Sequence, residues 1–413
     1  MSTVINTAHS KEHVKEHVSV QHTKRILFFS HVLQEPFVVL NQMLDVLLSA
    51  RLHASALQIS ALTSLRPTLA VLAFYWGSLL QLKPALLRLS ITVATGLATL
   101  FFLFTPWVDS ISYFIMAEAC FWLFCRAAIP AQMEILKINF ASGERERLFS
   151  QALSLSYVSG MIIGPILGVI LKASPEVWKQ LFCITAILYS LTAYLKNGFC
   201  IPHKNPEFTE LKIPLSQLII EPWRQSLRLL KSNVAFRHFQ IGFFISGAGL
   251  MFAKPSIPGF LTSLNLSFLE IFSLFTLLEG CGFIVASSFW ARYLARRSVS
   301  RAASRIVICF ALHPLCLLFA NVHPHLAFVA FFCYGVAQAG SRLLWNMAGP
   351  LLCGNESSAQ YSSVNILAVG IRGAFVPVLG GICTAFFGTH ISFLIGLICL
   401  LLGAVYFSLS HKS

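Results

Sequence analysis

Apolar segments of membrane-spanning length recur along this chain and restrict what it can fold into. A helix needs about 20 predominantly apolar residues to cross the hydrocarbon core of a bilayer. Such segments lie at about residues 26–49, 55–79, 85–106, 110–136, 150–171, 180–200, 238–262, 267–291, 304–321, 326–352, 360–385 and 389–409. Because a backbone in hydrocarbon must satisfy its own hydrogen bonds, we predict an all-α membrane protein with twelve transmembrane helices.

The composition excludes a soluble domain of any size. Of the 413 residues, 56% are hydrophobic and 11% are charged, whereas soluble proteins carry about a quarter charged residues. This composition is therefore typical of a membrane protein that crosses the bilayer many times.

The net charge of +14 is explained by topology rather than by a nucleic-acid partner. With a cytoplasmic N-terminus, 22 of the 30 Lys and Arg fall in cytoplasmic segments, three fall in outer loops (Arg51, Lys172 and Lys179) and five lie within spans. This imbalance is what the positive-inside rule requires. We therefore predict a multi-pass protein of the plasma or inner membrane with both termini cytoplasmic, and no binding of nucleic acid.

A composition shift in the middle of the chain divides the spans six and six. We predict a polar cytoplasmic tail at 1–25, an N-terminal six-helix bundle at 26–200, a basic cytoplasmic linker at 201–237, a C-terminal six-helix bundle at 238–409 and a short tail at 410–413. Within the linker, EPWRQSLRLLKSN places leucines beside Arg224, Arg228 and Lys231. This pattern predicts an amphipathic helix on the inner membrane surface; a plain solvated linker is the alternative.

The two halves carry a repeat. ERERLFSQALSLSYVSGMIIGPILG and ESSAQYSSVNILAVGIRGAFVPVLG align without a gap at an offset of 212, which matches Pro165 to Pro377 and Gly168 to Gly380. Six spans separate the copies, so both run in the same direction through the membrane. We therefore predict two pseudo-symmetric bundles related by an axis along the membrane normal, although short apolar segments with glycine and proline also match by chance.

Twelve spans in two halves with a basic central loop resemble the major facilitator superfamily of secondary transporters. Gly160, Gly164, Pro165 and Gly168 are similar to its GxxxGPxxGG motif in span five, with Val169 in the last position. In the loop after span two, Gly77 and Leu79 fit the GxLaDrxGrr motif, whereas Gln81 and Pro84 depart from it. The resemblance implies that spans 1, 4, 7 and 10 line a central cavity and that spans 2, 5, 8 and 11 form the seam between halves.

Ionisable side chains within spans are costly and mark candidate sites for substrate or ions. The cations of this kind are Arg66, Arg126, Lys254, Arg342 and Arg372, and the acids are Glu35, Asp45, Glu118 and Glu279, with Glu134 and Glu270 nearer span ends. Arg126 and Arg342 each lie 16 residues from the outer start of their spans, four and ten. A guanidinium presents planar, forked donors that suit carboxylate or phosphate. We predict an anion clamp at these two residues, with Arg66 and Arg372 as further substrate-binding residues; neutralisation by acids, such as Glu118 with Arg126, is the alternative.

Acids and cations at similar depth suggest ion pairs within helical hairpins. Residue counting places Arg66 near Glu35 and Lys254 near Glu279. Such pairs are either static ion pairs or coupling sites. In a coupling site the carboxylate releases its cationic partner and binds a proton during the cycle, which couples proton movement to transport. We assign coupling to Glu35, Glu279, Glu118, Asp45 and Lys254, with Glu35 first; the role of Arg372 is left open.

Glycine and proline in spans five and eleven suit helices that pack closely and bend at the seam. We predict packing and gating roles for Gly160, Gly164, Pro165, Gly168, Pro377 and Gly380, with packing alone as the alternative. The eleven cysteines show no paired spacing, so we expect no disulfide framework, no zinc site and no cofactor. His9, His13 and His17 lie four residues apart and would share one face of a helix; we expect a solvated tail without a metal, with metal binding as the alternative.

Together these features predict a secondary transporter that moves a small anionic or zwitterionic solute by alternating access, driven by an ion gradient or a counter-substrate. We expect a monomer in the lipid bilayer that is not an enzyme, and no Walker-type GxxxxGK[ST] appears. Two alternatives remain open. One is a membrane-embedded lipid-modifying enzyme that uses His313 or Glu118, and the other is a non-transporting sensor or scaffold of the same fold.

Overall fold

The chain folds almost entirely into helices. The computed structural model describes residues 2–82, 87–140, 144–199, 215–352 and 358–410, and within these ranges it contains no strand. Up to residue 199 the helices are α1 (Ser2–Gln42), α2 (Leu44–Leu52), α3 (Ala56–Leu82), α4 (Leu87–Ala98), η2 (Leu100–Trp107), α5 (Ile111–Asn139), α6 (Glu144–Ala173), η3 (Pro175–Val177) and α7 (Trp178–Asn197). We call this part the N-terminal half.

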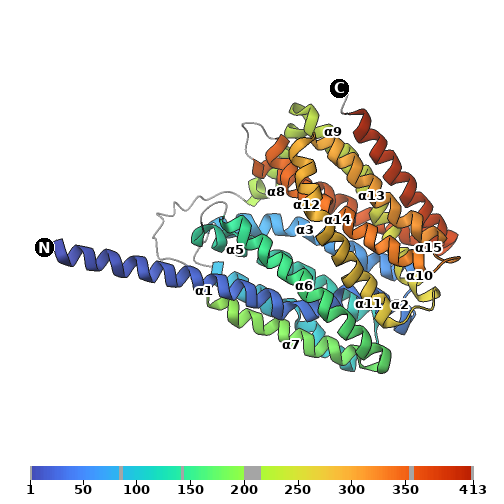
Figure 1. Cartoon of the computed structure of the whole chain (residues 1–413), viewed down its shortest axis with the longest axis horizontal. Helices are drawn as coiled ribbons and strands as arrows, with labels where there is room; N and C mark the ends of the chain where they lie inside the picture. The colour runs from blue at the N-terminus through green and yellow to red at the C-terminus, as the bar shows by residue number, and fades with distance from the viewer. Residues whose placement is uncertain (1, 83–86, 141–143, 200–214, 353–357, 411–413) are drawn as a thin grey trace.

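The C-terminal half begins at residue 215. Its helices are α8 (Leu215–Ser232), α9 (Val234–Ala253), η4 (Lys254–Ser256), α10 (Ile257–Ser263), α11 (Phe268–Ser273), η5 (Leu274–Leu278), α12 (Glu279–Arg296), α13 (Val299–Phe319), α14 (His325–Leu352) and α15 (Ser358–Leu409). The two halves lie side by side, the N-terminal half blue to green and the C-terminal half yellow to red (Figure 1).

All-helical architecture is as predicted, and nearly all described residues of each predicted apolar segment lie in a helix or in a run of consecutive helices. Among the described residues, seven helical stretches are long and apolar enough to cross a membrane. They are Leu87–Trp107, Ile111–Ile129, Ser154–Ala173, Phe268–Arg296, Val299–Phe319, His325–Trp345 and Val364–Leu409. These seven stretches are counted over the described residues alone, so the count of twelve spans stays a prediction.

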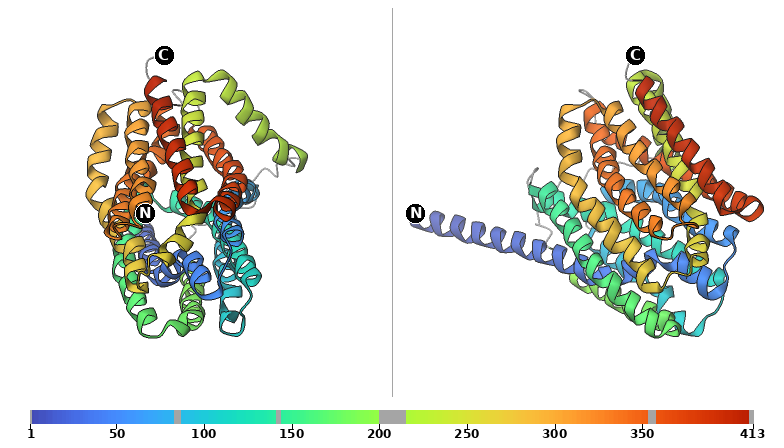
Figure 2. Two further views of the ribbon diagram at one scale, coloured as in Figure 1. Left: turned by 90° about the vertical axis from the view of Figure 1, so that its right-hand side faces the viewer. Right: turned by 45° about the vertical axis from the view of Figure 1, so that its right-hand side comes forward.

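Several helices depart from the predicted boundaries for local reasons. α1 runs as one helix from Ser2, so the backbone of the predicted polar tail continues the first span beyond the other helices (Figure 2, right). α15 covers two predicted spans, and Gly388 breaks its helical geometry with φ 84°. This left-handed backbone is readily adopted by glycine, and Gly388 supplies the turn between the two predicted segments.

Two sets of helices make the most extensive contacts between the halves, and α2 with α10 makes a further one. α3 packs against α15, and α6 packs against α11 and η5. These are parts of spans two and eleven and of spans five and eight, so the helices that the resemblance placed at the seam do meet there.

The buried core is continuous across the halves at one end of the molecule and divided at the other. We call the end that carries the N-terminus proximal and the opposite end distal. At the distal end one cluster joins Phe37, Phe102 and Phe182 of the N-terminal half to Phe260 and Phe331 of the C-terminal half. Among the described residues, the buried clusters at the proximal end each contain residues of one half.

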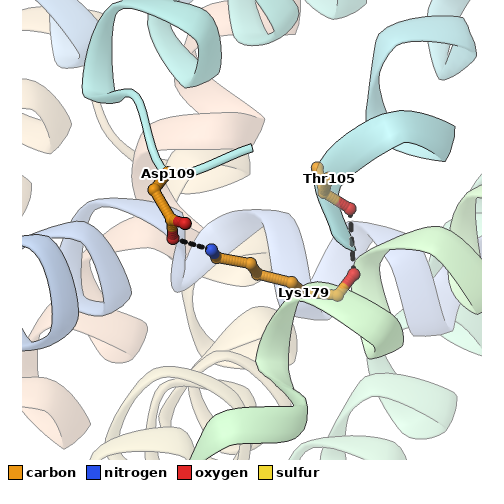
Figure 3. A network of polar contacts seen from close by, with 3 residues as sticks. All are labelled: Thr105, Asp109 and Lys179. Atoms are coloured by element: carbon orange, nitrogen blue, oxygen red, sulfur yellow. Dashed lines mark hydrogen bonds and ion pairs between the residues drawn. The ribbon is translucent and has the colours of Figure 1, made fainter. Parts of the chain in front are cut away.

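A polar network closes the distal end of the N-terminal half (Figure 3). Lys179 at the start of α7 forms an ion pair with Asp109, which follows η2. The Thr105 hydroxyl donates a hydrogen bond to the Lys179 backbone oxygen at 2.9 Å. The network ties η2 to α7 where these segments leave the apolar core.

Glycine allows α9 and α15 to approach closely, and substitution there should destabilise the C-terminal half. A Cβ at Gly249 would lie 2.5 Å from the Gly396 backbone oxygen, and Gly396 faces Gly249 in return. We expect Gly249→Leu to cost about 3 kcal/mol through overpacking, measured as thermal unfolding in detergent. Gly259→Leu is the matched control because nothing lies within 4 Å of a Cβ there. Equal melting of the two variants would contradict the packing role of Gly249.

Candidate functional site

One face of α5 carries an acid, an aromatic ring and a cation four residues apart, at Glu118, Trp122 and Arg126. The Trp122 indole donates a hydrogen bond to Glu118 Oε1 at 2.5 Å, and the Asn41 amide of α1 donates to the same oxygen at 3.2 Å. Glu118 is buried, and its Oε2 has no hydrogen-bond partner. The carboxylate is thus oriented by neutral donors rather than by a cation.

Arg66 of α3 lies against the same tryptophan. Its guanidinium carbon is 4.7 Å from the Trp122 ring centroid, and that of Arg126 is 5.5 Å from it. Two guanidinium groups therefore contact one indole, an arrangement in which cation–π attraction holds each side chain. Arg66 is exposed although it lies well inside a helix of 27 residues.

Arg342 of α14 is held by an aromatic pair that joins the halves. The rings of Tyr157 on α6 and Phe283 on α12 stack at 4.5 Å. The Arg342 guanidinium lies 5.0 Å from the Tyr157 centroid and 5.6 Å from that of Phe283. Its position thus depends on contact between an N-terminal and a C-terminal helix.

The three arginines form one electrostatic group with Arg66 in the middle. Arg66 lies within electrostatic range of Arg342 and of Arg126. Glu118 and Glu279 lie within range of Arg66 and reduce the repulsion without removing it. Like charges that lie near one another repel, so an anion bound among these groups would stabilise them.

The predicted ion pair of Arg66 with Glu35 does not form, and neither does the alternative pair of Glu118 with Arg126. In the parts of the chain that the structure describes, ion pairs join Arg51 to Glu176 and Lys179 to Asp109. Arg66 is directed to Trp122 and not to Glu35, and Glu118 accepts from Trp122 and Asn41 and not from Arg126. Residue counting along a span does not give the direction in which a side chain leaves its helix.

Glu35 lies in a separate polar site between α1 and α6. Its side chain is 7% exposed, and the Ser156 hydroxyl hydrogen-bonds to it. The same hydroxyl lies 3.1 Å from Nδ1 of His31, and a Cβ at Gly160 would be 3.0 Å from Glu35 Oε1. Gly160 thus makes room for a buried carboxylate that has no ion-pair partner among the described residues.

Lys254 faces an acid of the opposite half. Asp45 of α2 and Glu279 both lie within electrostatic range of Lys254, and the predicted ion pair of Lys254 with Glu279 is not among those of the described residues. Glu279 begins α12 directly after the π-helix η5. Short π-helical turns occur frequently at functional sites because they redirect the side chains that follow.

Arg372 stands apart from the other three arginines. It is 4% exposed, and its Nη1 donates to the backbone oxygen of Phe243 at 2.5 Å and to that of Phe244 at 3.3 Å. Its guanidinium packs on Gly247 of α9, and its Nε has no hydrogen-bond partner. The structure therefore places Arg372 inside the α9–α15 contact.

The contacts of Glu35 and Arg372 are related by the repeat. Glu35 of α1 packs on Gly160 of α6, and Arg372 of α15 packs on Gly247 of α9. At the offset of 212, Glu35 corresponds to Gly247 and Gly160 corresponds to Arg372. Each half thus packs one buried charged side chain against a glycine at the same pair of positions. In the N-terminal half the charge is negative and lies on the first helix of the pair, whereas in the C-terminal half it is positive and lies on the second.

The glycines of span five lie at the seam. A Cβ at Gly164 would lie 2.7 Å from Cβ of Thr276 in η5, and one at Gly168 would lie 2.7 Å from Cα of Leu269 in α11. Gly380 instead faces the Phe252 backbone of α9. α6 and α15 continue through Pro165 and Pro377, so these prolines lie inside helices and not at their ends.

His313 has a packing role. It is buried, with Nδ1 3.1 Å from the Ala330 backbone oxygen and its ring 5.2 Å from that of Phe331. Among the described residues, no group of three His, Cys, Asp or Glu side chains is placed to hold a metal ion. The side chains of His9, His13 and His17 lie outside the described residues.

Sequence comparison places most of the chain in one family. The family model described as Major Facilitator Superfamily matches residues 36–376. No curated protein matches the sequence.

Solved structures of transporters share the fold. A mutant of the nucleoside transporter NupG superposes with a TM-score of 0.72 at 13% identity, covering 95% of this chain and 99% of the other. A mutant of the peptide transporter POT in complex with alafosfalin gives 0.71 at 12% identity, covering 94% of both chains. The inward-open xylose transporter XylE from E. coli gives 0.63 at 11% identity, with 93% and 95% covered.

Proposed function

The chain belongs to the major facilitator superfamily, and from this premise we propose that it carries a small anionic or zwitterionic solute across a membrane by alternating access. Secondary transport is supported by the family and by structural neighbours that carry nucleosides, peptides and a sugar. Their substrates differ widely, so the substrate class has to be argued from the residues of this chain.

The observation that carries the proposed substrate class is the group formed by Arg66, Arg126 and Arg342. Two of these guanidiniums share Trp122, and the third is held by Tyr157 and Phe283. A guanidinium carries planar N–H donors that suit a carboxylate or phosphate, and Nε of Arg126 is buried without a hydrogen-bond partner. Glu118 and Glu279 nearby add acceptors for an amino group, which admits a zwitterion.

The residues around this group come from both halves, as alternating access requires. α3 and α5 belong to the N-terminal half, and α14 belongs to the C-terminal half. We propose twelve spans in two pseudo-symmetric six-helix bundles, with both termini cytoplasmic, and the exchanged contacts of Glu35 and Arg372 support the repeat. Rocking of the halves would then change the distance between Arg66 and Arg342 and so couple binding to opening.

We propose that Glu35 couples proton movement to transport. It is buried, it contacts only Ser156 and Gly160 in the interactions described above, and it lies on the helix that also carries Asn41 toward the arginines. A buried carboxylate without a cation gains from binding a proton. Asp45 of the N-terminal half lies within electrostatic range of Lys254 of the C-terminal half, as does Glu279, and we propose that these three residues respond to opening.

Anions should stabilise the purified protein, and the effect should depend on the arginines. At 100 times its Kd a ligand contributes about 2.7 kcal/mol, enough to raise the melting temperature measurably. We expect some members of a panel of phosphate esters, carboxylates and amino acids to do so, and Arg126→Ala and Arg342→Ala each to abolish the rise.

Arg292→Ala is the matched control because Arg292 is an exposed cation at the end of α12. Stabilisation that persists in both Arg126→Ala and Arg342→Ala would remove the site assignment. Stabilisation by organic cations alone would overturn the proposed substrate class.

A further inference from the structure

The helix α8 has three distinct surfaces. Leu229 is buried with Phe236 in the proximal cluster of the C-terminal half, so one side of α8 packs on the other helices of that half. Three large apolar side chains on another side remain exposed: Ile220 is 59%, Trp223 38% and Leu227 60% exposed. Their spacing of three and four residues places them on one helical stripe.

The third surface of α8 is basic and borders the apolar stripe. Arg224, Arg228 and Lys231 are all exposed and recur at spacings of four and three residues. On a helix with 3.6 residues per turn, these positions follow directly beside Ile220 and Leu227. The exposed part of α8 therefore presents an apolar stripe with a row of cations along one edge.

The connection to α9 fixes the direction of α8. Asn233 stands between the two helices, and its side chain accepts a hydrogen bond from the Phe236 backbone N–H at 2.9 Å. Its amide nitrogen donates to the Tyr361 hydroxyl at 2.9 Å and to the Leu352 backbone oxygen at 3.2 Å. Viewed with the long axis of the molecule toward the reader, α8 extends sideways from α9, beyond the other helices (Figure 2, left).

We propose that the exposed face of α8 binds anionic phospholipid headgroups of the bilayer that surrounds the protein. Ile220, Trp223 and Leu227 enter the boundary between headgroups and acyl chains, and the cations beside them contact lipid phosphates. The charge row argues for anionic lipids and not for a neutral surface, because basic residues at an interface are attracted by negative surface potential. The Asn233 connection transmits the docking to α9, and hence to the C-terminal half.

The test uses the full chain in lipid nanodiscs and measures amide hydrogen exchange of α8. We expect exchange over residues 223–232 to be at least about tenfold slower in discs that contain phosphatidylglycerol than in phosphatidylcholine alone. The triple variant Arg224→Gln, Arg228→Gln and Lys231→Gln should lose this difference. A matched control, Arg292→Gln, Arg296→Gln and Arg297→Gln, removes the same charge from another part of the proximal end and should keep it.

A second readout covers the apolar stripe. Fluorescence of Trp223, obtained by subtracting the spectrum of Trp223→Phe, should be quenched by lipids brominated near the headgroup. Equal exchange in both lipid mixtures, or a triple variant that behaves like the control, would overturn the proposal. Protection that appears in both mixtures and only in discs with two copies would assign the face to a second chain instead.

Discussion

Arg66→Ala is expected to weaken binding of the transported anion by about 100-fold, which corresponds to about 3 kcal/mol. Arg66 lies between Arg126 and Arg342 in the electrostatic group, and it is exposed where a solute can reach it. The substitution removes the hydrogen-bond donors of Arg66. It also removes one of the three positive charges that would attract the anion. The loss is measured as the Kd of a stabilising anion in equilibrium binding to the purified protein.

Arg66→Lys separates charge from geometry. A lysine keeps the positive charge but not the planar fork or the stacking on Trp122, so we expect a loss of about tenfold, intermediate between the wild type and Arg66→Ala. Arg372→Lys serves as a control for general disturbance, because Arg372 lies inside the α9–α15 contact and away from the group. Wild-type affinity in Arg66→Ala would show that the arginine group does not bind the solute.

Glu35→Gln is expected to abolish uphill transport while leaving exchange intact. Glutamine fills the same space against Gly160 and keeps a hydrogen bond to Ser156, so the fold should tolerate it. It cannot exchange a proton, so a pH gradient across proteoliposomes would no longer drive accumulation of the solute. The measurement compares gradient-driven accumulation with exchange of labelled for unlabelled solute.

Glu176→Gln is the matched control for this experiment. Glu176 is an exposed carboxylate at the distal end that pairs with Arg51, and its loss should change neither process. Accumulation that survives in Glu35→Gln would place the coupling group elsewhere, with Glu279 and Asp45 as the remaining candidates. Loss of exchange together with accumulation would instead show that Glu35 is needed for solute movement itself.

Helix positions could be predicted from the sequence because long apolar segments have few other solutions in a bilayer. The interruptions within them could not. Met43 separates α1 from α2, and the π-helix at Leu274–Leu278 precedes Glu279 inside a single predicted span. Neither changes the apolar pattern, because a shift of one or two backbone hydrogen bonds leaves the residues as hydrophobic as before.

The membership of the arginine group was predicted better than its contacts. Counting residues along each span predicts a depth for Arg126 and Arg342, but depth does not give the direction of a side chain around the helix axis. Arg66 was expected to meet Glu35 and instead contacts Trp122. The spacing of Glu118, Trp122 and Arg126 by four residues was a usable signal, since it places an aromatic ring on the same face as both charges.

The distal cluster of phenylalanines favours the conformation in which the distal end is closed. To open at that end, the protein must separate a buried apolar cluster shared by both halves and expose it to water. This costs about 25 cal/mol for each Å² of apolar surface exposed. At the proximal end the halves keep separate interiors, and parting them exposes far less. Without solute, the protein should therefore favour the conformation in which its distal end is closed. Solute binding must then supply the free energy that opening of the distal end requires.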